Sequence, residues 1–282
     1  MATDQTRSLL YMPASNARAV EKAQELPCDG VILDLEDSVA PEAKAEARAA
    51  AVAAARVGFG GRTVAIRCNG LDTEWGATDL RAAVRAGPDA VLAPKVSSVA
   101  EVHAWDAGLA GAPERTRLWI MVETALGVAQ IEQIAETARS TRLAGMVIGP
   151  NDLALELRLR PGHAREALRP ILIRTAVAAR AHGLRVFGGV FNAIDDEPGL
   201  AAECAEEAGF GFDGKTLIHP RQIAAANTAF SPSAEEIAWA RAVVAAFAAP
   251  EAAGQGAIRL DGKMVERLHL TAAERVLARA TG

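Results

Sequence analysis

The sequence predicts a (β/α)8 barrel with a short C-terminal extension. Eight apolar runs have the length of buried strands, and their starts lie about 24 to 40 residues apart, which suits one strand and one helix per unit. Alanine-rich segments with helical spacing lie between them. Right-handed β/α repetition over eight units closes into a barrel more readily than it forms an open sheet. A doubly wound sheet is the alternative, but no GxGxxG motif follows any run.

The elements follow one another in regular order. The expected strands begin near Arg7, Gly30, Thr63, Asp89, Arg117, Ala144, Leu184 and Asp213. The expected helices cover residues 16–26, 43–55, 78–86, 128–138, 164–182 and 200–208. Gly87, Gly183 and Gly209 each follow a helical segment, as expected of residues that cap a helix C-terminus.

The chain after the eighth strand has a different character. A helix over 233–248 is predicted from Ser233 as N-cap, with Glu236 three residues later. Beyond Pro250 come a small, glycine-containing segment, a short hairpin over 258–265, and a last helix from Thr271. We therefore expect a barrel domain of residues 1–250 and an extension of residues 251–282. The extension has too little apolar surface to fold by itself, so we expect it to pack on a neighbouring subunit.

Composition excludes several classes of protein. Half of the 282 residues are apolar, enough for a large core, and a net charge of -5 without a basic cluster argues against a nucleic-acid partner. Three unevenly spaced cysteines without a CxxC pair indicate neither a disulfide framework nor a zinc site, which fits a reducing cytoplasm. No signal peptide and no apolar run of about 18 residues is found, so a soluble, unexported protein without a membrane partner is expected.

Polar residues recur where the predicted strands end. The run over 118–122 closes on Glu123, and the run over 146–149 leads through a tight exit to Asp152. Carboxyl ends of the strands meet at one rim of a parallel barrel, which is where such enzymes carry their active sites. The residues expected at this rim are Asp34, Glu36, Asp37, Arg67, Asn69, Lys95, Glu123 and Asp152.

These side chains predict a metal site. Glu123 and Asp152 are hard oxygen donors without a histidine or cysteine partner, which select magnesium, manganese or calcium over zinc. A substrate with a carboxylate and an adjacent carbonyl or hydroxyl could complete the coordination shell. Arg67 would offer a planar fork to that carboxylate or to a developing enolate oxygen.

Seven motifs in order resemble one known family. They are RSLLYMP at 7–13 followed by Arg18 and Lys22, DLEDSV from Asp34, AIRCNG around Arg67, APKV ending at Val96, MVETALG around Glu123, GPNDL around Asp152, and GFDGKTLIHPRQ at 211–222. Together they resemble the citrate lyase β-subunit-like family, the branch of the HpcH/HpaI aldolase superfamily that includes malyl-CoA and citramalyl-CoA lyases. The resemblance runs from about residue 7 to 270.

The resemblance implies roles for individual residues. It makes Glu123 and Asp152 ligands of Mg²⁺, Arg67 a contact of the substrate, and Arg18 and Lys22 candidates for the CoA phosphates. A solvated basic helix face is the alternative for the last two.

Three more side chains are expected near the metal without binding it. Glu36, Asp37 and Lys95 would support the site, and a plain structural role is the alternative for each. His219, after the eighth strand, is expected to pack rather than to touch ligand.

The C-terminal extension departs from the family pattern. The family's lyases close the site with a C-terminal segment, usually from an adjacent subunit, whose acid is commonly Asp. Here residues 263–265 lead to Glu266. A misplacement on the order of 1 Å can cost about 100-fold in rate, so the longer side chain bears on carbon–carbon cleavage.

Three activities fit this pattern. The first is a magnesium-dependent lyase for malyl-CoA or citramalyl-CoA, with Arg67 and Glu266 as catalytic residues. The second is a thioesterase that hydrolyses such acyl-CoA thioesters at the same site. The third is a non-catalytic or carrier-dependent β-type subunit of citrate lyase. The resemblance also implies a homotrimer or a dimer of trimers.

Overall fold

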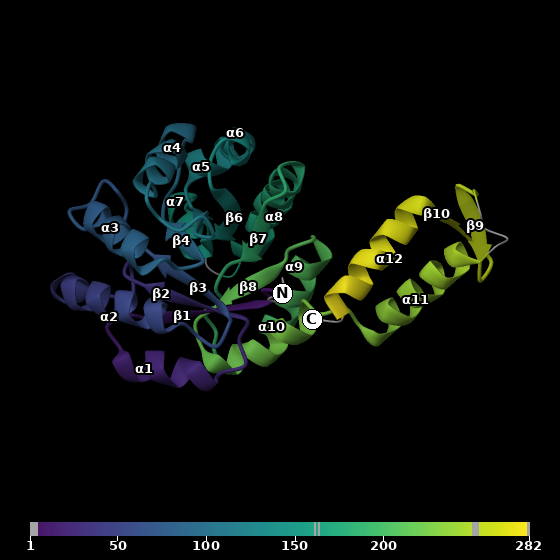
Figure 1. The fold of residues 1–282 in the computed structure, drawn as a ribbon, viewed down its shortest axis with the longest axis horizontal. Helices are drawn as coiled ribbons and strands as arrows, with labels where there is room; N and C mark the ends of the chain where they lie inside the picture. Colours follow the sequence, from purple (N-terminus) through teal and green to yellow (C-terminus); the bar gives the residue numbers. More distant parts are fainter. Residues whose placement is uncertain (1–4, 161, 163, 250–253, 281–282) are drawn as a thin grey trace.

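The main body of the protein is a closed barrel of parallel strands. The computed structural model describes residues 5–160, 162, 164–249 and 254–280. Within them each barrel strand pairs with the next, and β8 pairs with β1 (Figure 1). The strands are β1 (Ser8–Pro13), β2 (Gly30–Asp34), β3 (Thr63–Arg67), β4 (Ala90–Ala93), β5 (Arg117–Val122), β6 (Leu143–Ile148), β7 (Arg185–Gly188) and β8 (Gly214–Leu217). This is a (β/α)8 TIM barrel, and every predicted strand start is confirmed to within one residue.

Helices surround the barrel as predicted, with some differences. They are α1 (Ala17–Lys22), α2 (Lys44–Val57), α3 (Gly76–Ala86), α4 (Val99–Gly108), α5 (Ala125–Ala129), α6 (Ile131–Glu136), α7 (Pro150–Glu156), α8 (Ala164–Ala181), α9 (Glu197–Gly209) and α10 (Ile223–Ala229). Gly87 caps α3 with a φ of 65°, as predicted. The prediction for Gly209 was wrong, since α9 runs through it and Gly211 takes the positive φ of the turn.

The barrel interior is filled in layers because alternate residues of each strand point inward. Its apolar layers include Leu9, Ile32, Ala65, Leu92, Trp119, Met121, Val147 and Phe187. The rings of Trp119 and Phe187 lie 4.9 Å apart, and a Cβ at Gly145 would approach Trp119 to 2.7 Å. Two residues beyond an apolar inward position come Tyr11, Asp34, Arg67 and Glu123. The layer at the carboxyl ends of the strands is therefore polar.

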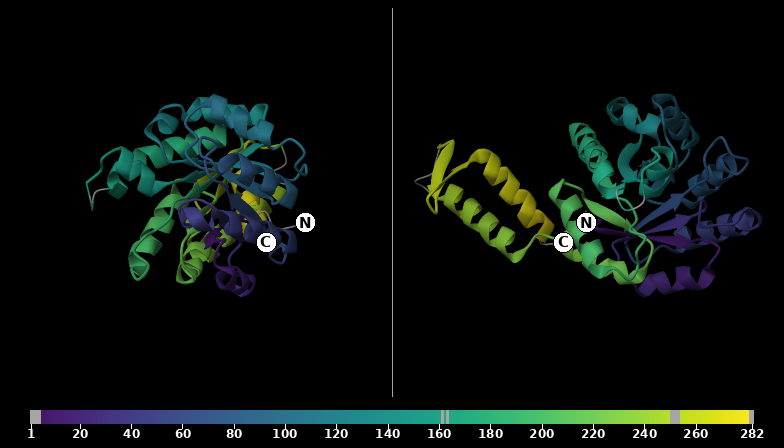
Figure 2. Two further views of the ribbon diagram at one scale, coloured as in Figure 1. Left: turned by 90° about the vertical axis from the view of Figure 1, so that its left-hand side faces the viewer. Right: turned by 180° about the vertical axis from the view of Figure 1, so that it is seen from behind.

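A helical appendage follows the barrel. It contains α11 (Ala234–Ala248), β9 (Ala257–Leu260), β10 (Lys263–Glu266) and α12 (Arg267–Ala280). The two helices pack on each other around a small separate core, and the β9–β10 hairpin lies at the end farthest from the barrel (Figures 1 and 2). The expected division after residue 250 stays a prediction, but α11 packs with the segments that follow this division.

The predicted elements of the appendage are largely confirmed. Ser233 and Glu236 form the expected capping box, and the hairpin turns at residues 261–262. The last helix begins at Arg267 rather than at Thr271. Its start is stabilised because the N–H of Glu266 donates to Nδ1 of His269, 2.9 Å away.

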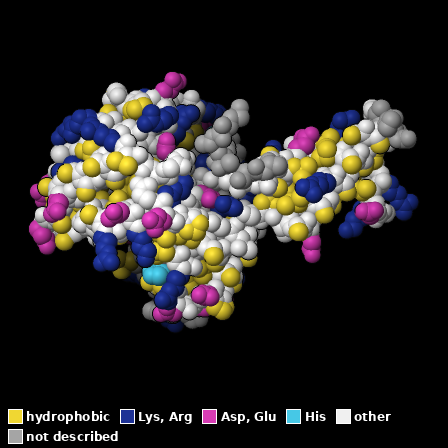
Figure 3. Space-filling model, turned by 60° about the horizontal axis from the view of Figure 1, so that its bottom comes forward, with side chains coloured by type: hydrophobic (Ala, Val, Ile, Leu, Met, Phe, Trp, Pro, Cys, Tyr) yellow, Lys and Arg dark blue, Asp and Glu magenta, His cyan; other side chains and the backbone are white. Residues whose placement is uncertain are grey.

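Polar contacts between described residues tie the C-terminal end of the appendage to the barrel. Arg279 Nη2 donates to the carbonyl of Phe230, 2.6 Å away, and the Gln5 amide donates to the carbonyl of Arg279. Apolar side chains remain exposed on the appendage, where Met264 is 69% and Leu268 is 64% exposed. Figure 3 shows hydrophobic side chains along this part of the surface.

Two further observations bear on the expectations from composition. No helix in the described part of the chain combines the length and the hydropathy that crossing a membrane requires. All three cysteines are buried free thiols.

Candidate active site

A cavity of about 270 Å³ opens at the carboxyl ends of the strands. Its lining includes Tyr11, Asp34, Arg67, Glu123 and Asp152, which come from β1, β2, β3, the end of β5 and the start of α7. The fold thus brings both predicted metal ligands and the predicted substrate arginine to one cavity. Their roles stay predictions at this point.

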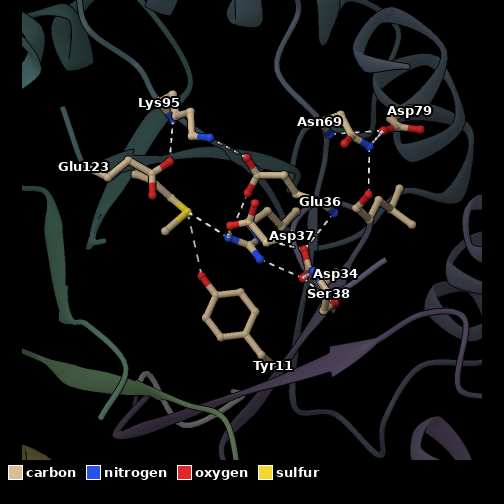
Figure 4. Close-up of polar contacts among 12 residues, drawn as sticks. Tyr11, Asp34, Glu36, Asp37, Ser38, Asn69, Asp79, Lys95 and Glu123 are labelled. Atoms are coloured by element: carbon tan, nitrogen blue, oxygen red, sulfur yellow. Dashed lines mark hydrogen bonds and ion pairs between the residues drawn. The ribbon is translucent and has the colours of Figure 1, made fainter. Parts of the chain in front are cut away.

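Arg67 is the centre of the charged network. Its Nε and Nη2 donate to the two oxygens of Asp34, at 2.6 and 2.7 Å, and its guanidinium lies 4.8 Å from the Tyr11 ring centre (Figure 4). The planar fork is therefore engaged by Asp34 and is not open to a substrate carboxylate. Burial alone would raise the pKa of Asp34, but the contacts with Arg67 lower it below its ordinary value.

Nη1 is the part of Arg67 that remains for other partners. It lies 2.8 Å from Glu36 Oε2 and 3.5 Å from Asp37 Oδ2. The N–H does not point at Glu36 Oε2, which accepts no hydrogen bond within the described residues, so this contact is an ion pair. Burial raises the pKa of Glu36 to about 7 against the opposing charge of Arg67.

The loop after β2 is held rigidly. Asp34 accepts hydrogen bonds from the backbone N–H groups of Glu36 and Ser38, which shapes the turn. Behind the loop, the buried ammonium of Lys44 donates to the carbonyls of Leu35 and Glu36 and to Oδ1 of Asn69, at 2.7 to 2.8 Å. Glu36 is thus positioned by its backbone rather than by its own side chain.

Glu123 lies immediately after β5 and is buried. Its Oε1 accepts a 2.7 Å hydrogen bond from the backbone N–H of Lys95. A Cβ at Gly149 would come within 2.4 Å of Glu123 Oε2, so the missing side chain on β6's exit makes room for the carboxylate. Burial, with the charge of Glu36 next, raises the pKa of Glu123 to about 8.

Asp152 is placed differently from the expectation of a strand end. Gly149 ends the extended run and Pro150 begins α7, so Asp152 lies in the first helical turn, where a carboxylate interacts favourably with the helix dipole. Its side chain is 34% exposed, and Oδ1 lies 3.7 Å from Lys95 Nζ. The carboxylate faces both the cavity and solvent.

The donor set fits Mg²⁺. Among the described residues, no three acidic, histidine or cysteine side chains converge closely enough to hold a metal alone. Mg²⁺ is commonly held by one or two carboxylates and keeps other positions for water and substrate oxygens. Burial is the main cause that raises the pKa values of Glu123 and Glu36, and neighbouring carboxylates add to it. A divalent ion bound beside them would stabilise their charged forms.

Other predicted residues lie outside the cavity. Arg18 and Lys22 are exposed on α1, one helical turn apart, and neither lines it. Glu266 is the last residue of β10, and this strand lies at the end of the appendage farthest from the barrel and its cavity (Figures 1 and 2). His219 caps a short helical turn through Nδ1, which accepts from the N–H of Arg221, as expected of a structural residue.

The sequence analysis missed Tyr11 as a site residue, and it missed the partner of Asp34. Tyr11 lines the cavity, and among the described residues the partner of its hydroxyl is the Met121 sulfur, at 3.9 Å. Its inward direction follows from alternation after Leu9, which was the available signal. Asp34 was expected at the rim, but nothing local predicted that it would engage Arg67.

Comparison with known proteins agrees with the fold and the motifs. The family model HpcH/HpaI aldolase/citrate lyase matches residues 7–220. A (3S)-malyl-CoA thioesterase from Cereibacter sphaeroides is 48% identical over 275 residues, covering 97% of this chain and 94% of that protein. Citrate lyase subunit beta from Escherichia coli is 34% identical over 284 residues, covering 97% and 93%.

Solved structures show the same relationship. The crystal structure of CitE from Mycobacterium tuberculosis in complex with magnesium, acetoacetate and coenzyme A superposes with a TM-score of 0.81. It is 32% identical and covers 99% of this chain and 100% of that one. The similarity thus includes the appendage as well as the barrel. The chain belongs to the HpcH/HpaI aldolase/citrate lyase family.

Proposed function

We propose that this protein is a Mg²⁺-dependent enzyme that hydrolyses a malyl-CoA-type thioester to the free acid and CoA. The observation that carries the proposal is the 48% identity, over nearly the whole chain, to a (3S)-malyl-CoA thioesterase. Identity to the citrate lyase β subunit over a similar length is lower, at 34%. The sequence alone favoured carbon–carbon cleavage, and this comparison moves hydrolysis to the first place.

Glu123 and Asp152 are the proposed holders of the metal. Bound Mg²⁺ would act as a Lewis acid on substrate oxygens and stabilise negative charge that develops there. The chain itself supplies one buried and one half-open carboxylate, so the ion would have protein on one side and the cavity on the other. This arrangement leaves coordination positions for the acid portion of the substrate.

Arg67 and Tyr11 are the proposed contacts of the substrate. With its fork held by Asp34, Arg67 would act through Nη1 as a fixed positive charge rather than as a bidentate clamp. The Tyr11 hydroxyl, whose partner in the described part of the chain is a thioether 3.9 Å away, would donate to a substrate oxygen. Both residues belong to strands of the barrel, so their side chains need little reorganisation when substrate binds.

Carbon–carbon cleavage of malyl-CoA or citramalyl-CoA is the second candidate. It is favoured by the family model and by the same donor set, which suits an enolate as well as a tetrahedral intermediate. A carrier-dependent β-type subunit is the third, favoured by the citrate lyase relatives.

We also propose that the working protein is a homotrimer or a dimer of trimers in which Glu266 enters a neighbouring site. The distance of β10 from its own barrel and the exposed Met264 and Leu268 beside it support this assembly. Arg18 and Lys22 remain proposed contacts of the CoA phosphates.

One experiment separates the candidates. Purified protein with Mg²⁺ is incubated with malyl-CoA, citramalyl-CoA and citryl thioesters, and free thiol and keto acid are measured separately. Free thiol with the intact hydroxy acid (malate, citramalate or citrate) and without keto acid indicates hydrolysis. The acetyl thioester with glyoxylate, pyruvate or oxaloacetate, respectively, indicates cleavage. Glu123→Gln and Asp152→Asn serve as controls and should form neither thiol nor keto acid. Inactivity on every substrate, with Mg²⁺ still bound, would refute both enzymatic candidates and favour the subunit.

A further inference from the structure

Lys95 has an unusual backbone for a residue with a side chain. It follows Pro94 at the exit of β4 and has a φ of 53°. In the described part of the chain only two other non-glycine residues, Arg158 and Asp261, have positive φ. This left-handed conformation costs free energy because Cβ crowds the backbone, and such strain tends to persist at functional sites.

The strained turn sends the two ends of Lys95 to different partners. Its backbone N–H points at Glu123 Oε1, 2.7 Å away, while its side chain extends toward Glu36 and Asp152. Nζ lies 3.8 Å from Glu36 Oε1 (Figure 4). It also lies 3.7 Å from Asp152 Oδ1. One residue therefore contacts three carboxylates that come from three different β/α units of the barrel.

The two kinds of contact differ in strength. The backbone contact has hydrogen-bond length, whereas both Nζ contacts exceed the usual 2.7 to 3.2 Å of an N–H···O bond. The ammonium is thus held between Glu36 and Asp152 by charge, without a directed bond to either. Its side chain is half exposed, so it can move into solvent without breaking a hydrogen bond.

We propose that Lys95 is a positioning residue with a built-in counter-cation. Its backbone fixes Glu123 whether or not metal is present, and its ammonium compensates the charge of Asp152 and Glu36 in the metal-free protein. When a divalent ion binds between Glu123 and Asp152, the ammonium leaves Asp152. This inference rests on the metal site of the proposed function and adds an exchange between two cations to it.

The exchange predicts an unusual direction for a substitution at an active site. Lys95→Met keeps the length of the stem and the backbone N–H but removes the charge. Because the competing positive charge is lost, Mg²⁺ should bind about tenfold more tightly. The metal-free variant should melt at a lower temperature than wild type, since two carboxylates lose their counter-charge. Lys95→Arg keeps the charge and should keep near wild-type affinity.

The test is Mg²⁺ titration calorimetry on the full-length protein without substrate, with thermal melting in EDTA alongside. Arg81→Met, which removes one positive charge from the exposed face of α3, is the matched control and should leave the affinity unchanged. Glu123→Gln and Asp152→Asn report on the metal site itself. If wild type binds no Mg²⁺, or these two variants bind it normally, the proposed metal site fails.

The outcomes for Lys95 are separate from that result. With the metal site established, tighter binding by Lys95→Met and a lower melting temperature in EDTA support the exchange. Unchanged or weaker binding by Lys95→Met overturns it, because a side chain that merely supports the site would not oppose the metal.

Discussion

The buried carboxylate of Glu123 should make the metal-free protein less stable as the pH rises. Its pKa is about 8 in the folded protein against an ordinary value of 4.5, so between these values the folded site keeps a proton that the unfolded chain has lost. The unfolded state then binds fewer protons, and the free energy of unfolding falls with pH by about 1.4 kcal/mol per unit. At pH 7 the loss approaches about 3 kcal/mol, and it is absent below pH 4.5.

Glu123→Gln removes this dependence while it keeps the size of the side chain and an acceptor for the Lys95 N–H. We expect the metal-free variant to exceed wild type at pH 7 by up to about 3 kcal/mol, which corresponds to several degrees in melting temperature for a chain of this length. The unfolding free energies of the two proteins should become similar near pH 4.5, where the side chain of residue 123 is largely neutral in both. Mg²⁺ should raise the melting temperature of wild type, increasingly with pH, and should have no effect on the variant.

Calorimetric melting in EDTA from pH 4.5 to 8.5, repeated with Mg²⁺, measures these quantities. Glu136→Gln, on the exposed surface of α6, is the matched control and should retain the wild-type slope. Parallel pH profiles for wild type and Glu123→Gln would refute the reasoning, because the pH dependence of the unfolding free energy would then come from other groups.

Three further substitutions test other parts of the site. Arg67→Lys keeps the charge but loses the two bonds to Asp34, so turnover should fall about 100-fold or more, and an unchanged rate would make Arg67 structural. Gly149→Ala places a methyl group against the Glu123 carboxylate and should weaken Mg²⁺ binding about 10- to 100-fold by calorimetry, whereas an unaltered affinity would mean that the carboxylate can shift freely. Glu266→Ala should lower turnover without affecting Mg²⁺ binding, and mixing it with Arg67→Ala protein should restore part of the activity if subunits share sites. No recovery despite demonstrated subunit exchange would confine each site to one chain.

Much of the barrel could be predicted because its strands are short apolar runs that turn polar abruptly. The alternation from Met121 to Glu123 also predicts that the carboxylate points inward, and the structure has it so. Whether a segment forms a helix or a strand was easiest to predict where the pattern of apolar residues was long, as in α8. The short helix α7 was missed because Pro150 and Asn151 are equally compatible with a turn.

The interior of the site was harder to predict because its geometry depends on contacts between distant strands. Asp34 and Arg67 are 33 residues apart, and only strand register brings them side by side. The left-handed backbone of Lys95 could not be predicted either, since lysine has no preference for it and tertiary contacts impose it. The sequence therefore indicated which residues meet at the rim, but not how Arg67 divides its donors among them.

The slender junction between barrel and appendage has a consequence for how the molecule holds together. The hydrophobic core around Val243, Val265 and Ala273 is separate from the main one, and few described polar contacts bridge them near Phe230. Cooperativity of unfolding spreads through shared packing, so disorder in α12 need not propagate into the strands. Amide protons of the appendage would then exchange through openings of their own. Proteolytic nicking at the junction would liberate a barrel with its interior layers undisturbed.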